Sequence, residues 1–319
     1  MSGLYVGNAE DENLKSGTTV LYGDKPFAAS VDVRGGAPGT RETDLLAADK
    51  LVQAIDSIVL SGGSAFGLEA AGGVMDELHR RGRGFQVAEV HVPLVSAAII
   101  FDLLNGGDKQ WTSNPYPELG RLAMQNAAID FALGSFGAGT GATTANLKGG
   151  LGSASVKMPD GSMIGALVVV NARGSVVAAD SGQFWAAPFE HSGEFGNYGI
   201  CTNPSEYNLI ADGLAETPGS NTTIAIVATD APLNTSQLKR LATVSHDGLA
   251  RAIVPAHTLF DGDLVFSLST NETGSVDPAT EATLGHAASV CLSRAIARGV
   301  YEASSSARDT LPCWQEKYL

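Results

Sequence analysis

Short apolar runs alternate along the chain with longer segments in which apolar residues recur every three or four positions. The runs rich in β-branched residues predict buried strands, at 18–22, 27–33, 57–62, 165–172, 223–229 and 263–269. The longer periodicity predicts helices at 67–81, 118–133 and 280–303. In the first of these helices one face carries Leu68, Ala71, Val74, Met75 and Leu78.

Local signals sharpen this pattern. Met-Pro-Asp-Gly-Ser at 158–162 has the composition of a tight turn, so the segments around it are expected to form a hairpin. Asn234, followed by Gln237, predicts a helix N-cap with its N3 partner. Several predicted strands are apolar at consecutive positions, so both of their faces should be covered. We therefore expect an α/β fold in which sheets are sandwiched between layers of helices.

Composition and charge narrow the possible functions. The chain has 319 residues, of which 44% are hydrophobic, and no repeat, charge block or composition break divides it, so we treat 1–319 as a single domain. The formal net charge is −14, and an acidic surface repels phosphate backbones and anionic lipid. No nucleic-acid or membrane partner is expected, and small neutral or cationic substrates suit this charge.

The cysteines and the N-terminal sequence indicate in which cellular compartment the protein is expected. Cys201, Cys291 and Cys313 are few, odd in number and widely spaced, which argues against a disulfide framework or a zinc site. The first residues lack the basic and apolar regions of a signal peptide, and no run of eighteen apolar residues occurs. We expect a cytoplasmic protein.

A glycine-rich turn follows the predicted strand at 57–62. Gly62, Gly63 and Ser64 suggest a nucleophile elbow, but the next glycine, Gly67, comes one position too late. The spacing also fails the dinucleotide and phosphate-loop patterns. Two interpretations stay open: a tight connection from strand to helix, or a pocket wall made of backbone amides.

Lys148 lies in a second glycine-rich segment, at 134–155. A lysine among glycines and small residues is either exposed or held near a pocket. In a pocket it could donate to an oxyanion or orient a nucleophile.

Asp261 and Asp263 are two positions apart at the start of a predicted strand, so both carboxylates should point to one face. With His257 they could bind a metal, although no further ligand has a recognisable spacing. Alternatively, they belong to a turn in which aspartates cap backbone amides.

Thr222 and Thr223 lie between the loop 218–221 and an apolar strand. This is an ordinary start for a strand. If the bond before Thr222 were cut, however, the residue would gain an α-amine with an ordinary pKa of about 7.7–8.0. Thr222 would then supply both nucleophile and base, and a tight loop at 219–221 could strain the bond to be cut.

Taken together, six stretches occur in the order that is typical of one family, and the chain resembles the DmpA-type family along nearly its whole length. The stretches are 31–46, 61–74, 148–155, 165–172, 221–233 and 257–266. The family comprises L-aminopeptidase/D-alanyl-esterase-amidases, β-aminopeptidases and the nylon-oligomer endo-hydrolase. The resemblance implies a four-layer αββα sandwich and an N-terminal-nucleophile hydrolase, made as a precursor that cuts itself into two associated chains.

The resemblance also implies roles for individual residues. Cleavage would fall between Asn221 and Thr222, giving an α chain 1–221 and a β chain 222–319. The Asn-Thr-Thr at this point is similar to that of the nylon-oligomer hydrolase, whereas other members use serine. Asn171 matches the family's oxyanion-stabilising asparagine.

Other matched positions complete the implied site. Lys148 matches the motif lysine, and Asp261 and Asp263 match the acidic pair that would orient the amine and hydroxyl of Thr222. Phe101 stands where other members have a tyrosine, which leaves the substrate class open. The resemblance implies neither a cofactor nor a metal, and it implies a homo-oligomer of α/β heterodimers.

The function that follows is an amide hydrolase for short peptides, β-peptides, amino-acid amides or 6-aminohexanoate oligomers. Two alternatives remain. Ornithine acetyltransferases also cut themselves before a threonine, but their Ala-Thr-Met type of context is missing here. An uncleaved, non-catalytic protein could instead bind a small molecule with its glycine-rich turns.

Overall fold

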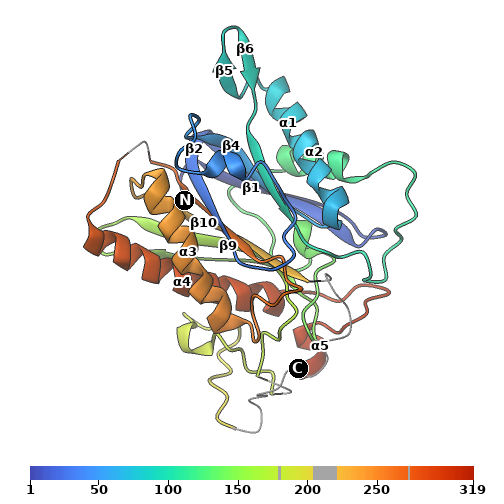
Figure 1. The fold of residues 1–319 in the computed structure, drawn as a ribbon. Helices are drawn as coiled ribbons and strands as arrows, with labels where there is room; N and C mark the ends of the chain where they lie inside the picture. Colours follow the sequence, from blue (N-terminus) through green and yellow to red (C-terminus); the bar gives the residue numbers. More distant parts are fainter. Residues whose placement is uncertain (179–180, 204–220, 272–273) are drawn as a thin grey trace.

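The computed structural model describes residues 1–178, 181–203, 221–271 and 274–319 (Figure 1). The loop 218–220, which the sequence predicts before Asn221, lies outside the described residues. The strands are β1 (Leu4–Asp11), β2 (Ser16–Val33), β3 (Thr40–Arg41), β4 (Ile55–Ser61), β5 (Phe85–Val87), β6 (Val90–Val92), β7 (Val95–Ile99), β8 (Gly150–Lys157), β9 (Met163–Asn171), β10 (Thr222–Thr229) and β11 (Leu264–Ser269). The helices are α1 (Ala70–Arg80), α2 (Tyr116–Gln125), α3 (Thr235–Ala252), α4 (Pro278–Tyr301) and α5 (Trp314–Tyr318).

The long strand β2 joins two halves of the β structure. Its first half pairs antiparallel with β1 and β4, and its second half pairs antiparallel with β11. The strand order is β3-β7-β4-β2-β11-β10-β9-β8, with β1 beside β2. Strands β10 and β11 run parallel to each other, whereas β10 and β9 are antiparallel.

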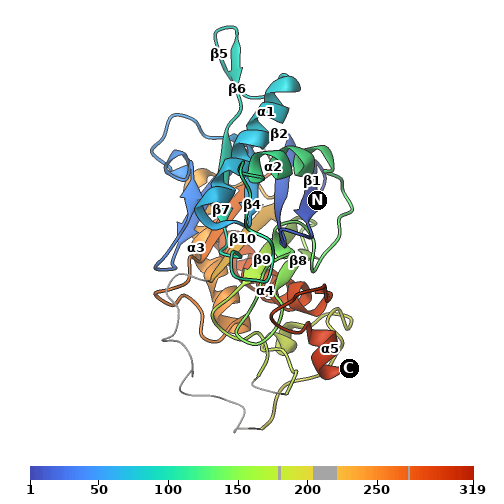
Figure 2. The same ribbon diagram turned by 90° about the vertical axis from the view of Figure 1, so that its right-hand side faces the viewer.

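Three buried cores separate four layers. One core lies between the two halves of the β structure and includes Leu21, Leu60, Ile224 and Phe266. A second core packs α1 and α2 on β1, β2, β4 and β7, and a third packs α3 and α4 on the strands from β8 to β11 (Figures 1 and 2). The predicted αββα sandwich is therefore confirmed.

Most predicted strands are confirmed within two residues, and the hairpin around 158–162 joins β8 to β9. The expectation of separate strands at 18–22 and 27–33 is wrong. Both belong to β2, where Gly23 to Pro26 stay extended and the pairing with β4 shifts register between Tyr22 and Phe27. Glycine and proline change the register here without ending the strand.

The predicted helix at 280–303 corresponds to α4, and that at 67–81 to a 3-10 turn followed by α1. The predicted helix at 118–133 ends early, at Gln125. The reason is a backbone exchange with β1, in which Ala128 donates to and accepts from Val6 at 3.0 Å. At Asn234 the predicted capping box is confirmed, since Asn234 and Gln237 bond each other's backbone amides.

The strands β5 and β6 form a hairpin that projects beyond α1 (Figures 1 and 2). Its cross-strand pairs Phe85–Val92 and Val87–Val90 are all exposed. Among the helices that the structure describes, none is both long enough and apolar enough to cross a membrane.

The third core depends on a glycine contact between α4 and β8, which generates a stability prediction. A Cβ at Gly152 would lie 1.9 Å from the carbonyl oxygen of Ala295, so Gly152→Ala should force strand and helix apart. We expect a loss of about 1–3 kcal/mol in the free energy of unfolding, measured by urea denaturation.

The control for this prediction is Gly165→Ala on the neighbouring strand, where the nearest atoms would lie 3.9 Å from the new Cβ. It should unfold at nearly the wild-type urea concentration. Equal destabilisation by both variants would show that the close approach of α4 to β8 does not limit stability.

Candidate active site

Thr222, the first residue of β10, lies between Asn171 and Gly262. In the antiparallel pairing of β10 with β9, Thr222 is directly opposite Asn171. On the other side, β11 pairs with β10 so that Ile224 matches Leu264, and two residues earlier the amide of Gly262 lies 3.2 Å from the Thr222 hydroxyl oxygen. Three neighbouring strands therefore position these residues.

The alternation of side chains along β10 distinguishes the two threonines. Ile224 and Ile226 face the core between the sheets, whereas Ala225 and Val227 face α3 and α4. Because strand side chains have a period of two, Thr222 points toward the inter-sheet side. Thr223 points the other way, and its buried hydroxyl has no hydrogen-bond partner within the described part of the chain.

One backbone amide contacts both the peptide bond before Thr222 and the Thr222 hydroxyl. Gly262 N–H lies 3.2 Å from the carbonyl oxygen of Asn221 and 3.2 Å from the Thr222 hydroxyl oxygen. The Thr222 hydroxyl in turn donates to the Asn221 carbonyl. A Cβ at Gly262 would lie 2.7 Å from the Thr222 hydroxyl oxygen, so this close approach requires glycine. Gly262 lies between Asp261 and Asp263, but nothing in the sequence pattern indicated this contact.

Asn171 is fully buried, and its side-chain amide is oriented by the backbone around it. Its Oδ1 accepts a hydrogen bond from Thr143 N–H at 2.9 Å, and its Nδ2 donates to the carbonyl oxygen of Phe101 at 3.1 Å. Phe101 therefore adjoins Asn171 through its carbonyl group.

Asp261 and Asp263 accept hydrogen bonds from backbone amides, one of which belongs to the residue after Thr222. Asp263 accepts hydrogen bonds from Thr223 N–H at 2.7 Å and from His257 N–H at 3.0 Å. Asp261 accepts from Arg173 N–H at 3.2 Å and from Thr258 N–H at 2.9 Å. These are contacts of aspartates that cap backbone amides. In the described ranges, no group of three or more His, Cys, Asp or Glu side chains is arranged to hold a metal.

Two histidines form a chain of contacts from Asp263 to Asp32. His257 Nδ1 lies 2.8 Å from Asp263 Oδ2, and its Nε2 lies 3.3 Å from Nδ1 of the buried His246. Burial lowers the pKa of His246 to about 4, so this ring is neutral near pH 7. Burial, followed by repulsion from Asp263, raises the pKa of Asp261. Sequence spacing gave no sign of this histidine pair.

Lys148 is buried and is not the exposed lysine of one interpretation. Its ammonium group lies 2.9 Å from Asp309 Oδ2, and Lys15 contacts the other oxygen of the same carboxylate. Lys148 and Thr143 also line one small cavity.

The backbone amides of the glycine-rich turn donate hydrogen bonds to other groups of the chain. Gly62 N–H donates to Gly17, Gly63 N–H donates to Asp102 at 2.7 Å, and Ser64 N–H donates to Ile100. This is a tight connection from strand to helix. The three amides donate within the protein, and a place for Gly62, Gly63 and Ser64 in the substrate pocket stays a prediction.

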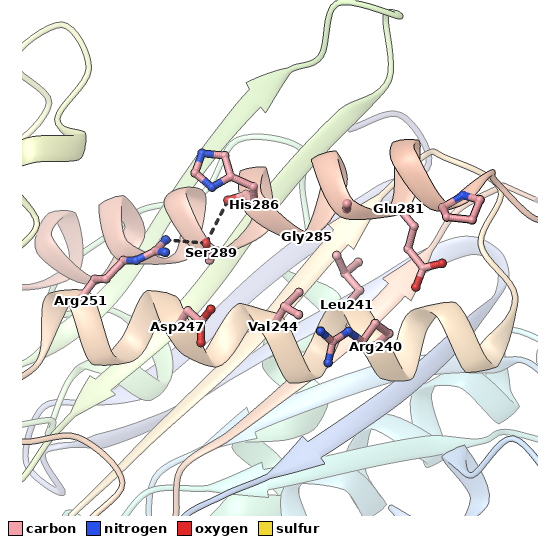
Figure 3. A pocket seen from close by; sticks show the side chains of 11 residues that line it. Arg240, Leu241, Val244, Asp247, Arg251, Glu281, Gly285, His286 and Ser289 are labelled. Carbon is pink, nitrogen blue, oxygen red and sulfur yellow. Dashed lines mark hydrogen bonds between the residues drawn. The ribbon is translucent and has the colours of Figure 1, made fainter.

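A larger cavity, of about 460 Å³, lies between α3 and α4. Figure 3 shows Arg240, Asp247 and Arg251 on one helix and Glu281 and His286 on the other. None of its lining residues belongs to the group around Thr222. We therefore do not assign the chemistry at Thr222 to this cavity.

Solved structures share this fold. A β-aminopeptidase from Burkholderia sp. superimposes with a TM-score of 0.69 at 20% identity, covering 99% of this chain and 91% of the other. The L-aminopeptidase D-Ala-esterase/amidase of Ochrobactrum anthropi, described as a variant of the Ntn-hydrolase fold, gives 0.70 at 21% identity, covering 98% and 88%. The likeness establishes the fold.

Sequence comparison establishes the family. An uncharacterized aminopeptidase of Mycobacterium tuberculosis is 40% identical over 317 residues, covering 93% of this chain and 90% of the relative. A 6-aminohexanoate-oligomer endohydrolase of Paenarthrobacter ureafaciens is 30% identical over 289 residues, covering 85% and 74%. Peptidase family S58 matches residues 1–310. The chain therefore belongs to peptidase family S58.

Proposed function

We propose that the protein is a self-processing amide hydrolase whose nucleophile is an N-terminal threonine, Thr222. The observation that carries the proposal is the Gly262 amide, 3.2 Å from both the Asn221 carbonyl oxygen and the Thr222 hydroxyl oxygen. An N–H group at this place stabilises the negative charge that develops on the carbonyl when the hydroxyl attacks it. Cleavage gives chains 1–221 and 222–319.

Self-cleavage proceeds by transfer of the acyl group from nitrogen to oxygen. Thr222 Oγ1 forms a bond to the carbonyl carbon of Asn221, the bond from that carbon to the Thr222 nitrogen breaks, and the hydroxyl proton passes to the nitrogen. Water then hydrolyses the ester. The products are a carboxylate on Asn221 and, on Thr222, a free hydroxyl with a free α-amine.

The new α-amine then serves hydrolysis. It accepts the Thr222 hydroxyl proton as Oγ1 attacks the substrate carbonyl, and it returns the proton to the leaving amine. Asn171, opposite Thr222, supplies a hydrogen-bond donor for the oxyanion. Asp263 holds the Thr223 amide and so fixes the new N-terminus. Water finally releases the acyl group from Thr222.

The names of the relatives guide the choice of substrates. They include aminopeptidases and endohydrolases of 6-aminohexanoate oligomers. We propose that short peptides, β-peptides, amino-acid amides or such oligomers are cleaved. A panel of L- and D-alanine amide, a β-alanyl dipeptide and the linear 6-aminohexanoate trimer tests the class. Failure to hydrolyse any member in cleaved, folded protein would contradict this substrate assignment.

Thr222→Ala should abolish both self-cleavage and hydrolysis, because no hydroxyl remains to attack. Denaturing gels should show one band at 32.8 kDa for the variant, whereas the wild type should give a fragment of about 10 kDa. N-terminal sequencing of that fragment should begin at Thr222.

The matched control is Thr223→Val. The Thr223 hydroxyl is buried without a hydrogen-bond partner within the described part of the chain, so an isosteric methyl group should be tolerated and the cut should remain. If Thr223→Val stayed uncut while Thr222→Ala was cut, the nucleophile would not be Thr222, and the proposal would be contradicted.

Gly262→Ala should slow self-cleavage. The added Cβ would approach the Thr222 hydroxyl oxygen to 2.7 Å and displace it from the Asn221 carbonyl, and misplacement by about 1 Å can cost about 100-fold in rate. The appearance of the fragment over time after synthesis measures this rate. Gly165→Ala, whose new Cβ would have its nearest neighbours at 3.9 Å, should cut at the wild-type rate. Equal rates for both variants would remove Gly262 from the proposed mechanism.

A further inference from the structure

Two buried lysines of the proposed N-terminal product contact one carboxylate of the proposed C-terminal product. Lys15 and Lys148 lie before Thr222 in the chain, and Asp309 lies after it. Lys148 Nζ is 2.9 Å from Asp309 Oδ2, and Lys15 contacts Oδ1. Both lysine side chains are only 4% exposed. A buried ammonium group is unfavourable without an ionic partner, so both depend on Asp309.

Asp309 is itself held in place. Ser306 N–H donates to its Oδ2 at 2.7 Å, and Lys148 N–H donates to the carbonyl of Pro312 at 2.8 Å, which joins the flanking segment to the base of β8. Burial acts to raise the pKa of Asp309, but the hydrogen bonds from Lys15 and Lys148 outweigh it and lower that pKa. The carboxylate is therefore ionised and fixed between the two ammonium groups.

The cluster is connected to the candidate site. Lys148 forms a backbone bridge with Thr143, and Thr143 N–H donates to Asn171 Oδ1 at 2.9 Å. Asn171 in turn lies opposite Thr222. Thr143, Lys148 and Asp309 line one small cavity. The ion pair of Asp309 with Lys148 is therefore joined to Asn171 through the backbone of Thr143.

We propose that Asp309 is a positioning residue for amide hydrolysis. Its carboxylate holds Lys148, whose backbone pairs with Thr143, and so fixes the Thr143 amide that orients Asn171, the residue proposed to stabilise the oxyanion. This inference rests on the proposed function of Thr222. It adds a residue from the C-terminal product that acts through a lysine of the N-terminal product.

The test is a double-mutant cycle on the self-cleaved protein. Asp309→Asn should lower kcat about 10- to 100-fold, because Lys148 loses its fixed position, while KM changes less. Asp309→Glu keeps the charge and should recover part of kcat. Lys148→Met should lower kcat to a similar extent, and adding Asp309→Asn to it should cost little more, because both changes remove one interaction. The assay uses the member of the substrate panel that the wild type cleaves fastest.

The control is Asp247→Asn, the same chemical change at an exposed position of the same product chain (Figure 3). It should leave kcat and KM unchanged. Two outcomes would overturn the inference, provided that the wild type is cut and active. In one, the double variant loses kcat by the product of the two single losses of Asp309→Asn and Lys148→Met. In the other, Asp309→Asn keeps the wild-type kcat. If Asp309→Asn does not fold, the same cycle with Asp309→Glu decides. A wild type that is neither cut at Thr222 nor active would instead overturn the proposed function.

Discussion

The register of β10 between β9 and β11 is the constraint on which the candidate site depends. It sets Thr222 opposite Asn171 and brings the Gly262 amide to the bond before Thr222. A slip by one residue would exchange the faces of Thr222 and Thr223. The core opposes such a slip, because isoleucines fill the inter-sheet side of β10 whereas Ala225 and Val227 pack against the helices. Hydrophobic packing thus selects which hydroxyl faces the site.

Burial then fixes the orientation of the side chains at the candidate site. The side chains of Asn171, Asp261 and Asp263 are almost fully buried, and the hydrogen bonds described for them go mainly to backbone amides and carbonyls of neighbouring loops. An unpaired polar group would be costly at these places, so each side chain has a preferred orientation before any substrate arrives. Electrostatic stabilisation of a transition state is most effective when its dipoles are oriented in advance.

The sequence predicted those parts of the fold and site that leave a local trace. Alternating and continuous apolar runs revealed the strands, and Asn-Thr-Thr before such a run drew attention to Thr222. Contacts between distant segments leave no periodic trace. Lys148 and Asp309 are 161 positions apart, and the early end of α2 depends on a bridge to Val6 in β1. Gly262 was missed for another reason: its contribution is a backbone amide, which residue type does not reveal.

The strand order explains how the proposed products can remain together once the chain is cut. In the series β2-β11-β10-β9, the two inner strands follow Thr222 in the chain and the two outer strands precede it. Separation would require breaking the ladders of β2 with β11 and of β10 with β9, and it would expose two hydrophobic cores. The cut therefore need not loosen the site. It changes the chemistry of Thr222 while the register that positions this residue stays in place.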